Sequence, residues 1–341
     1  MNSFLVILSS ILLISLFNFF FYKKEFLLDK KKLSHKSFLS NNSVPLTGGI
    51  VILFNLLIFS NNYLIIFFIL IFILGVFSDL FLITSALKKF LIQFLIIFLF
   101  VYLLDLRIIN TKINFLDYFL KYKVFALLFS CICLLILING TNFIDGINTL
   151  ACGYYILILL VILYIGEKNK LFYNFDDFYY LFLTLITVFV FNAFSKIYLG
   201  DSGSFLLSFV IGYYLINLFN NNLVLKEPIS SVFIILLLWY PAFENFFSII
   251  RKALNKIHPS SPDNLHMHHL LFVFLKKKSK ININFLNTIT GILINFYNLL
   301  IFILGSQFYS QGKYLSYVVF FNISFYLGVY FFLRREIRKY I

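Results

Sequence analysis

Long apolar stretches alternate with short polar segments along almost the whole chain. A helix needs about 20 apolar residues to cross about 30 Å of hydrocarbon, and eleven stretches approach that length. The pattern therefore predicts an all-α, polytopic integral membrane protein with about 11 transmembrane helices. The expected helices cover residues 3–22, 48–61, 63–78, 87–104, 124–142, 148–165, 178–195, 203–219, 229–250, 285–304 and 314–333.

Composition supports this fold class, since 61% of the residues are hydrophobic and only 12% are charged. The first apolar stretch has no basic n-region and no small-residue cleavage site, so we expect a retained helix rather than a signal peptide. No soluble segment or long linker divides the chain. Residues 1–341 are therefore expected to form a single membrane-embedded domain.

Lysine and arginine are distributed unequally between the two sets of alternating loops. One set holds 20 of the 28 basic residues. The positive-inside rule makes that side cytoplasmic, with the N-terminus outside and the C-terminus cytoplasmic. This set consists of residues 23–47, 79–89, 143–147, 196–202, 251–284 and 334–341.

The net charge of +14 is spread over positions that flank the predicted helices. Basic residues at such positions set the topology and attract anionic lipid headgroups. We therefore expect the lipid bilayer, and no nucleic acid, as the partner of these charges.

Four short polar islands carry most of the candidate chemistry. They read GVFSDL with Asp79, NGTNFIDGIN with Asp145, KIYLGDSGS with Asp201, and SPDNLHMHH with Asp263. All lie on the predicted cytoplasmic face, although their aspartates and histidines were not counted in choosing that face. A charge near the bilayer centre costs at least ~2.5–3.5 kcal/mol, so such groups usually line a cavity or carry function. The islands predict a membrane-embedded active site.

Carboxylates beside glycines at a membrane surface suit a divalent cation and a phosphorylated ligand. Mg²⁺ is held by one or two carboxylates plus phosphate oxygens and water. In LGDSGS, Gly200 and Gly203 relax the backbone, so amides can face an anion while Asp201 faces the cation. A simpler alternative is a capping turn, with Asp201 or Ser202 as the N-cap of the next helix.

The second island, and the segment that follows the first island, offer further ligands. Asn142 and Asp145 lie three residues apart, so a continuing helix places both on one face. The alternative is a helix end that these two side chains satisfy. Lys89 and Gln93 lie one turn apart and are expected to face the same pocket as Asp79, although a lysine there is often a snorkelling anchor.

Three histidines close the fourth island, in a long predicted loop. His266, His268 and His269 can donate to phosphate oxygens. A zinc site that adds His258 is a weaker alternative, because no cysteine or carboxylate constellation supports it. A solvated loop without a chemical role is another.

Together the islands resemble a known set of motifs. VPLTGG, NGTNFIDGINTLACG, KIYLGDSGS and SPDNLHMHHL occur in the order and at the spacing typical of the polyprenyl-phosphate N-acetylhexosamine-1-phosphate transferases. This glycosyltransferase family 4-type group also includes phospho-MurNAc-pentapeptide transferase. The resemblance runs from residue 44 to residue 270, so the first predicted helix and the last two lie outside it.

The resemblance implies a role for each matched residue. It implies Mg²⁺ as the cofactor, with Mn²⁺ as an alternative. The implied metal ligands are Asn142 and Asp201, the catalytic residues are Asp79 and Asp145, and the substrate-binding residues are Thr47, Gly48, Lys89, His266, His268 and His269.

The same resemblance implies an activity and a location. A modified or unmodified N-acetylhexosamine-1-phosphate passes from a UDP-sugar to polyprenyl (undecaprenyl) phosphate, giving polyprenyl-diphospho-sugar and UMP and priming a cell-surface polysaccharide. The implied location is the bacterial inner membrane, with the active site on the cytoplasmic face. The resemblance is also compatible with a homodimer. The alternatives are the pentapeptide transferase, an inactive family member and, more remotely, a membrane transporter.

Two positions depart from the family pattern. Ser78 stands where the family has the first aspartate of a DD pair, and Glu244, in PAFEN, stands where it has an aspartate. Serine cannot act as a carboxylate base at neutral pH. Any mechanism that needs a base at the first position is therefore in doubt, whereas Glu244 keeps its charge.

Overall fold

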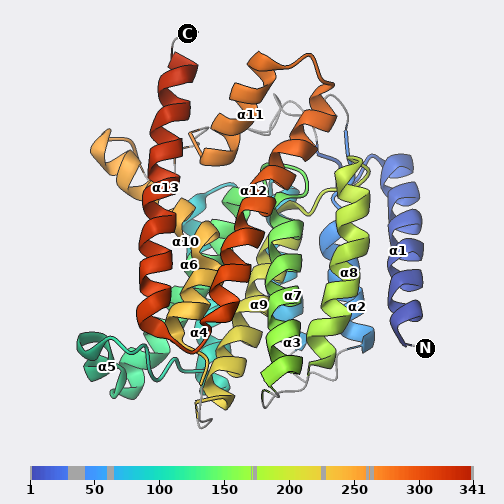
Figure 1. Ribbon diagram of the computed structural model, residues 1–341. Coiled ribbons are helices and arrows are strands. Elements are labelled where there is room, and N and C mark those ends of the chain that lie inside the picture. The colour runs from blue at the N-terminus through green and yellow to red at the C-terminus, as the bar shows by residue number, and fades with distance from the viewer. Residues whose placement is uncertain are drawn as a thin grey trace.

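A computed structural model describes residues 2–29, 43–59, 65–169, 171, 175–223, 228–258, 261 and 265–338 (Figure 1). Over these ranges the chain forms thirteen helices and no β-strand. They are α1 (Asn2–Lys24), α2 (Gly48–Phe59), α3 (Ile65–Asp79), α4 (Ala86–Leu103), α5 (Asn114–Leu120), α6 (Lys123–Ile144), α7 (Leu150–Asn169), α8 (Asp176–Ala193), α9 (Gly200–Asn221), α10 (Ser231–Leu254), α11 (Met267–Lys278), α12 (Ile283–Gln307) and α13 (Gly312–Arg338).

Each of the eleven expected apolar helices is present. Within the described ranges, nine helices are long and apolar enough to cross a membrane by length and composition, and α2 and α3 are shorter apolar helices of 12 and 15 residues. The chain is thus an all-helical polytopic membrane protein. The number of crossings and their orientation stay predictions.

Two helices were not expected from the sequence. The segment between α4 and α6 contains α5, and the long segment between α10 and α12, predicted to be a loop, contains α11. Both are short, with 7 and 12 residues, so neither reaches the length that identifies a membrane span. Helix α11 packs on α12 and α13, and this tertiary packing stabilises a helix too short to persist alone.

Helix α9 is the centre of the bundle. In its most apolar window 89% of the residues are buried, against 22% for the peripheral helices α1, α4 and α13. It packs on α3, α6 and α2. Because α9 begins in the KIYLGDSGS island, this packing places Asp201 where several helix ends meet.

The two ends of the bundle differ in what they carry. Helix α3 ends, α9 begins and α6 ends at the same end of the molecule, where α11 and the C-terminus also lie (Figure 1). The N-terminus and α5 lie at the opposite end. The polar islands within the described residues are therefore gathered at one end; Asp263 lies outside those residues.

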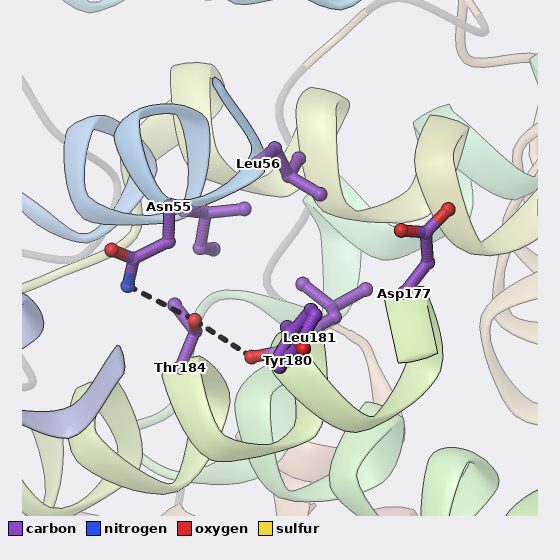
Figure 2. Close-up of a pocket in the computed structure, with 7 residues that line it drawn as sticks. Asn55, Leu56, Asp177, Tyr180, Leu181 and Thr184 are labelled. Atoms are coloured by element: carbon purple, nitrogen blue, oxygen red, sulfur yellow. Dashed lines mark hydrogen bonds between the residues drawn. The ribbon is translucent and has the colours of Figure 1, made fainter. Parts of the chain in front are cut away.

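A buried polar cluster joins α1, α2 and α8 away from this end. Asn55 Nδ2 donates to Ser10 Oγ at 2.7 Å. It also donates to Thr184 Oγ1 at 3.0 Å, beside a small pocket that Asp177 also lines (Figure 2). Ser9 Oγ donates to Asn55 Oδ1 at 2.9 Å. Hydrogen bonds between membrane helices contribute ~0.6 kcal/mol on average, so this cluster aligns the three helices.

Candidate active site

Helix α9 is capped by a side chain from another helix. The backbone amides of Asp201 and Ser202 donate to Asp79 Oδ1 and Oδ2 at 2.8 and 3.0 Å. Leu199, in the N-cap position, makes no side-chain capping bond. Asp79, the last residue of α3, therefore does what an N-cap side chain does. The alternative in which Asp201 or Ser202 caps its own helix is wrong.

Two glycines allow this contact between α3 and α9. Gly200 has φ +71°, which disfavours an L side chain, and a Cβ there would lie 2.8 Å from Asp79 Oδ2. A Cβ on Gly75 of α3 would lie 2.3 Å from the Cα of Ser202. Any larger residue at either position would push the two helix ends apart.

The carboxylate of Asp201 is held by its neighbours and remains partly exposed. Ser78 Oγ donates to Asp201 Oδ2, and Lys89 Nζ lies 3.4 Å from the same oxygen. The Asp201 side chain is 26% exposed. Its position in the first turn of α9 favours negative charge because of the helix dipole. Lys89 thus belongs to the Asp201 cluster, whereas a substrate role for it stays a prediction.

Gln93, expected to face the same pocket as Lys89, is hydrogen-bonded to a neighbouring helix. Its side chain is buried, and Asn139 Nδ2 of α6 donates to its Oε1 at 3.1 Å. The residue therefore joins α4 to α6 by a hydrogen bond.

The end of α6 meets the first turn of α9. Helix α6 continues to Ile144, two residues further than expected, so Asn142 is helical and Asp145 is the C-cap residue. Ser204 Oγ donates to Asn142 Oδ1 at 3.3 Å. Asn142 and Asp201 therefore lie on adjoining helix ends, and Asn142 and Asp145 are both partly exposed.

The histidines lie at the start of α11 and are oriented by Glu244 of α10. His266 Nδ1 lies 2.8 Å from Glu244 Oε2, and the Met267 amide donates to Glu244 Oε1 at 3.1 Å. An ionised carboxylate only accepts, so the contact places a proton on His266 Nδ1. A buried carboxylate thereby caps α11 and fixes the imidazole ring, as carboxylates do for functional histidines elsewhere.

Helix α10 is held firmly next to Glu244. Pro241 lacks an N–H and leaves the Leu237 carbonyl without its helical donor. Tyr154 of α7 donates its hydroxyl to that carbonyl at 2.7 Å. Gly140 of α6 approaches so closely that a Cβ would lie 2.1 Å from the Pro241 oxygen. The proline turn is therefore clamped from two sides.

The histidine cluster contacts the Asp145 island. A Cβ on Gly146 would lie 2.7 Å from His269 Nε2 and 3.3 Å from His268 Nε2. The ring of His266 packs on Phe143, with centroids 5.1 Å apart. All three histidines are buried, so the alternative of a solvated loop is wrong for these side chains, and their chemical role stays a prediction.

The TGG segment packs against the loop that leads into α9. The Gly48 amide donates to the Tyr198 carbonyl at 3.0 Å, and Thr47 Oγ1 donates to Asn18 Oδ1 at 2.9 Å. A Cβ on Gly49 would lie 2.6 Å from the Gly203 amide nitrogen. These contacts make Thr47 and Gly48 part of the packing beneath Asp201, and their substrate role stays a prediction.

The donor set fits Mg²⁺ better than zinc. Asp201 and Asn142 offer partly exposed oxygens on adjoining helix ends, and Mg²⁺ completes its shell with phosphate and water. Over the part of the chain that the structure describes, no three histidine, cysteine or acidic residues are grouped to hold a metal ion, so the zinc alternative gains no support.

Comparisons with known proteins agree with the family resemblance of the polar islands. Residues 61–219, which include Asp79, Asp145 and Asp201, match the model of glycosyl transferase family 4. An undecaprenyl-phosphate alpha-N-acetylglucosaminyl 1-phosphate transferase of Thermotoga maritima is 28% identical over 280 residues, 80% of this chain and 80% of the relative. A probable undecaprenyl-phosphate N-acetylglucosaminyl 1-phosphate transferase of Bacillus subtilis is 33% identical over 144 residues, 40% of this chain and 37% of the relative. Residues 61–219, just under half of the chain, thus match glycosyl transferase family 4, the group that the islands resemble.

Proposed function

We propose that the protein transfers an N-acetylhexosamine-1-phosphate from a UDP-sugar to polyprenyl phosphate, giving polyprenyl-diphospho-sugar and UMP. The observation that carries the proposal is the meeting of Asp79, Ser78 and Lys89 around Asp201 at the end of the bundle that also holds Asn142. The names of the two relatives support the lipid acceptor and the sugar phosphate.

The reaction is a phosphoryl transfer. An oxygen of the lipid phosphate attacks the β-phosphorus of the UDP-sugar and forms a new P–O bond. The bond between the β-phosphorus and the oxygen that bridges it to the α-phosphorus breaks, and UMP leaves. The sugar C1–O bond stays intact, so the anomeric configuration is retained. The lipid phosphate is largely ionised at neutral pH, so the step consists mostly of positioning and charge neutralisation.

The residues of the site would divide this work. Asp201 and Asn142 would hold Mg²⁺, which supplies charge neutralisation at the diphosphate. Lys89 adds a positive charge 3.4 Å from Asp201, and His268 and His269, which lie against Gly146, face the same island. Asp145 would orient the acceptor phosphate. Both oxygens of Asp79 accept α9 amides, so we assign Asp79 to holding the first turn in place.

The absence of an aspartate at position 78 is compatible with this scheme. Ser78 donates to Asp201 and so supports the proposed metal ligand without acting as a base. An acceptor that arrives ionised needs no base. The protein is therefore proposed as an active enzyme that primes a surface polysaccharide from the cytoplasmic face of the membrane.

Mass spectrometry of the lipid products tests the function. The purified protein is incubated with polyprenyl phosphate, Mg²⁺ and a panel of UDP-sugars that includes UDP-N-acetylhexosamines and UDP-MurNAc-pentapeptide. We expect a lipid diphosphate that carries one N-acetylhexosamine. A product only from the pentapeptide donor would favour the pentapeptide transferase, and no lipid product from any donor would contradict the proposal.

A further inference from the structure

Glu244 receives a third hydrogen bond from the last helix of the chain. Tyr326 of α13 donates its hydroxyl to Glu244 Oε1 at 2.8 Å, beside the bond from the Met267 amide to the same oxygen. Glu244 is fully buried, and Tyr326 is 2% exposed. A buried charge is costly unless it is paired and hydrogen-bonded, so each donor contributes to where this carboxylate lies.

The ring of Tyr326 is fixed by packing on α10. It meets Trp239, Phe243 and Phe247 edge-on, with centroids 6.0, 4.9 and 5.9 Å apart. Such edge-to-face pairs stabilise a defined ring orientation. The hydroxyl is thus held against Glu244 by a rigid aromatic cluster.

We propose that Tyr326 is a positioning residue for the histidine cluster, acting through Glu244 on the start of α11. The expected effect of Tyr326 on the reaction rests on the proposed function. Its expected effect on the start of α11 rests on the geometry alone. Tyr326 lies outside residues 61–219, the segment that matches the family model. The last helix would then contribute to the site without contacting substrate.

Loss of the Tyr326 hydroxyl is expected to let the Glu244 carboxylate turn toward His268. Among the described residues, the Met267 amide would then be the remaining hydrogen-bond donor to Glu244 Oε1, and His268 Nδ1 lies 4.0 Å from the same oxygen. The carboxylate would be free to turn toward His268, which would weaken its bond to His266. The imidazole edges that lie against Gly146 would then lose their alignment, because His268 and His269 follow in the same helical turn.

Tyr326→Phe is the direct test, with Tyr297→Phe as the matched control. The hydroxyl of Tyr297 in α12 donates a partly buried hydrogen bond to Asn322 Oδ1 of α13. Tyr297→Phe therefore also removes one tyrosine hydroxyl that contacts α13. We expect Tyr326→Phe to lower kcat/KM for the sugar nucleotide about tenfold, mainly through KM, with KM for the lipid unchanged. The control should keep both values. Equal effects of the two variants, or none, would overturn the inference.

Hydrogen exchange gives a readout that needs no catalysis. In Tyr326→Phe the amides at the start of α11 should exchange faster than in the wild type and in Tyr297→Phe, because the Glu244 cap is loosened. Unchanged exchange would overturn the inference. If the wild type transfers no sugar phosphate, the proposed function fails while this measurement still decides the positioning role.

A double-mutant cycle separates action through Glu244 from a general loss of packing. Tyr326→Phe combined with Glu244→Gln should be no worse than Glu244→Gln alone, because the hydroxyl acts only through that carboxylate. Additive losses would contradict the proposed route.

Discussion

The amide of Asp201 donates a 2.8 Å hydrogen bond to the carboxylate of Asp79, so the last residue of α3 fixes the first turn of α9. Asp79→Asn keeps the size of the side chain but turns one acceptor into a donor that faces an amide hydrogen. We expect a loss of ~0.5–2 kcal/mol of stability, the cost of losing a cap. Activity should fall on the order of 10²-fold, because a small displacement of reacting groups is enough for that.

Asp177→Asn is the control for Asp79→Asn. Asp177 lines the pocket between α2 and α8 and is not part of the islands (Figure 2). Its variant should keep the thermal midpoint in detergent and the rate. Wild-type values for Asp79→Asn in both measurements would show that the cap is dispensable.

Ser78 tests whether the departure from the family pattern weakens the enzyme. Ser78→Ala removes one hydrogen bond to Asp201, worth ~0.5–1.5 kcal/mol, and should slow UMP release about tenfold or less. Ser78→Thr, which keeps the hydroxyl, is the matched variant. A rise of several orders of magnitude in Ser78→Asp would instead indicate a weakened or inactive family member.

Removal of either Asp201, the proposed metal ligand, or Asp145, which is proposed to orient the acceptor phosphate, should abolish transfer. Asp201→Ala and Asp145→Ala should each lose ~10³-fold or more in rate, because electrostatic stabilisation at the diphosphate disappears. Asp105→Ala, which removes an exposed residue paired with Arg107 and Lys123, should keep the rate. Excess chelator should stop the wild type, and Mg²⁺ or Mn²⁺ should restore it. Full turnover in chelator would rule out the metal.

Orientation in the membrane is tested by thiol labelling in a background without the native cysteines. Leu265→Cys lies beside His266, and Phe115→Cys lies in α5 at the opposite end of the bundle (Figure 1). Both positions are exposed, at 37% and 76%. On intact cells an impermeant reagent should label Phe115→Cys and spare Leu265→Cys. The reverse pattern would invert the predicted topology.

The sequence predicted the long helices well, because their apolar pattern depends only on local composition. It missed α11, whose apolar run, residues 270–275, is far shorter than a membrane span and becomes a stable helix by packing on α12 and α13. It also placed the start of α9 at residue 203, three residues late, since the cap that begins the helix at Gly200 comes from Asp79 of another helix.

The site was predicted as a set of islands but without their contacts. Spacing along the chain indicated that Asn142 and Asp145 act together, yet it contained no signal that Gly146 lies against the histidines. Tyr326 had no motif at all, because its role depends on a contact with Glu244, 82 residues earlier. Such contacts are properties of the packed bundle, so neither motif nor periodicity reveals them.

The nucleotide released in the reaction tests the central claim most directly. The protein is incubated with a UDP-N-acetylhexosamine and polyprenyl phosphate. In the same sample, the released nucleotide is quantified by chromatography and the lipid product by mass spectrometry. Transfer of the sugar phosphate predicts UMP in equal amount to polyprenyl-diphospho-sugar, with neither product from Asp201→Ala. Release of UDP with a polyprenyl-monophospho-sugar would show that the sugar C1–O bond is broken and would contradict the account.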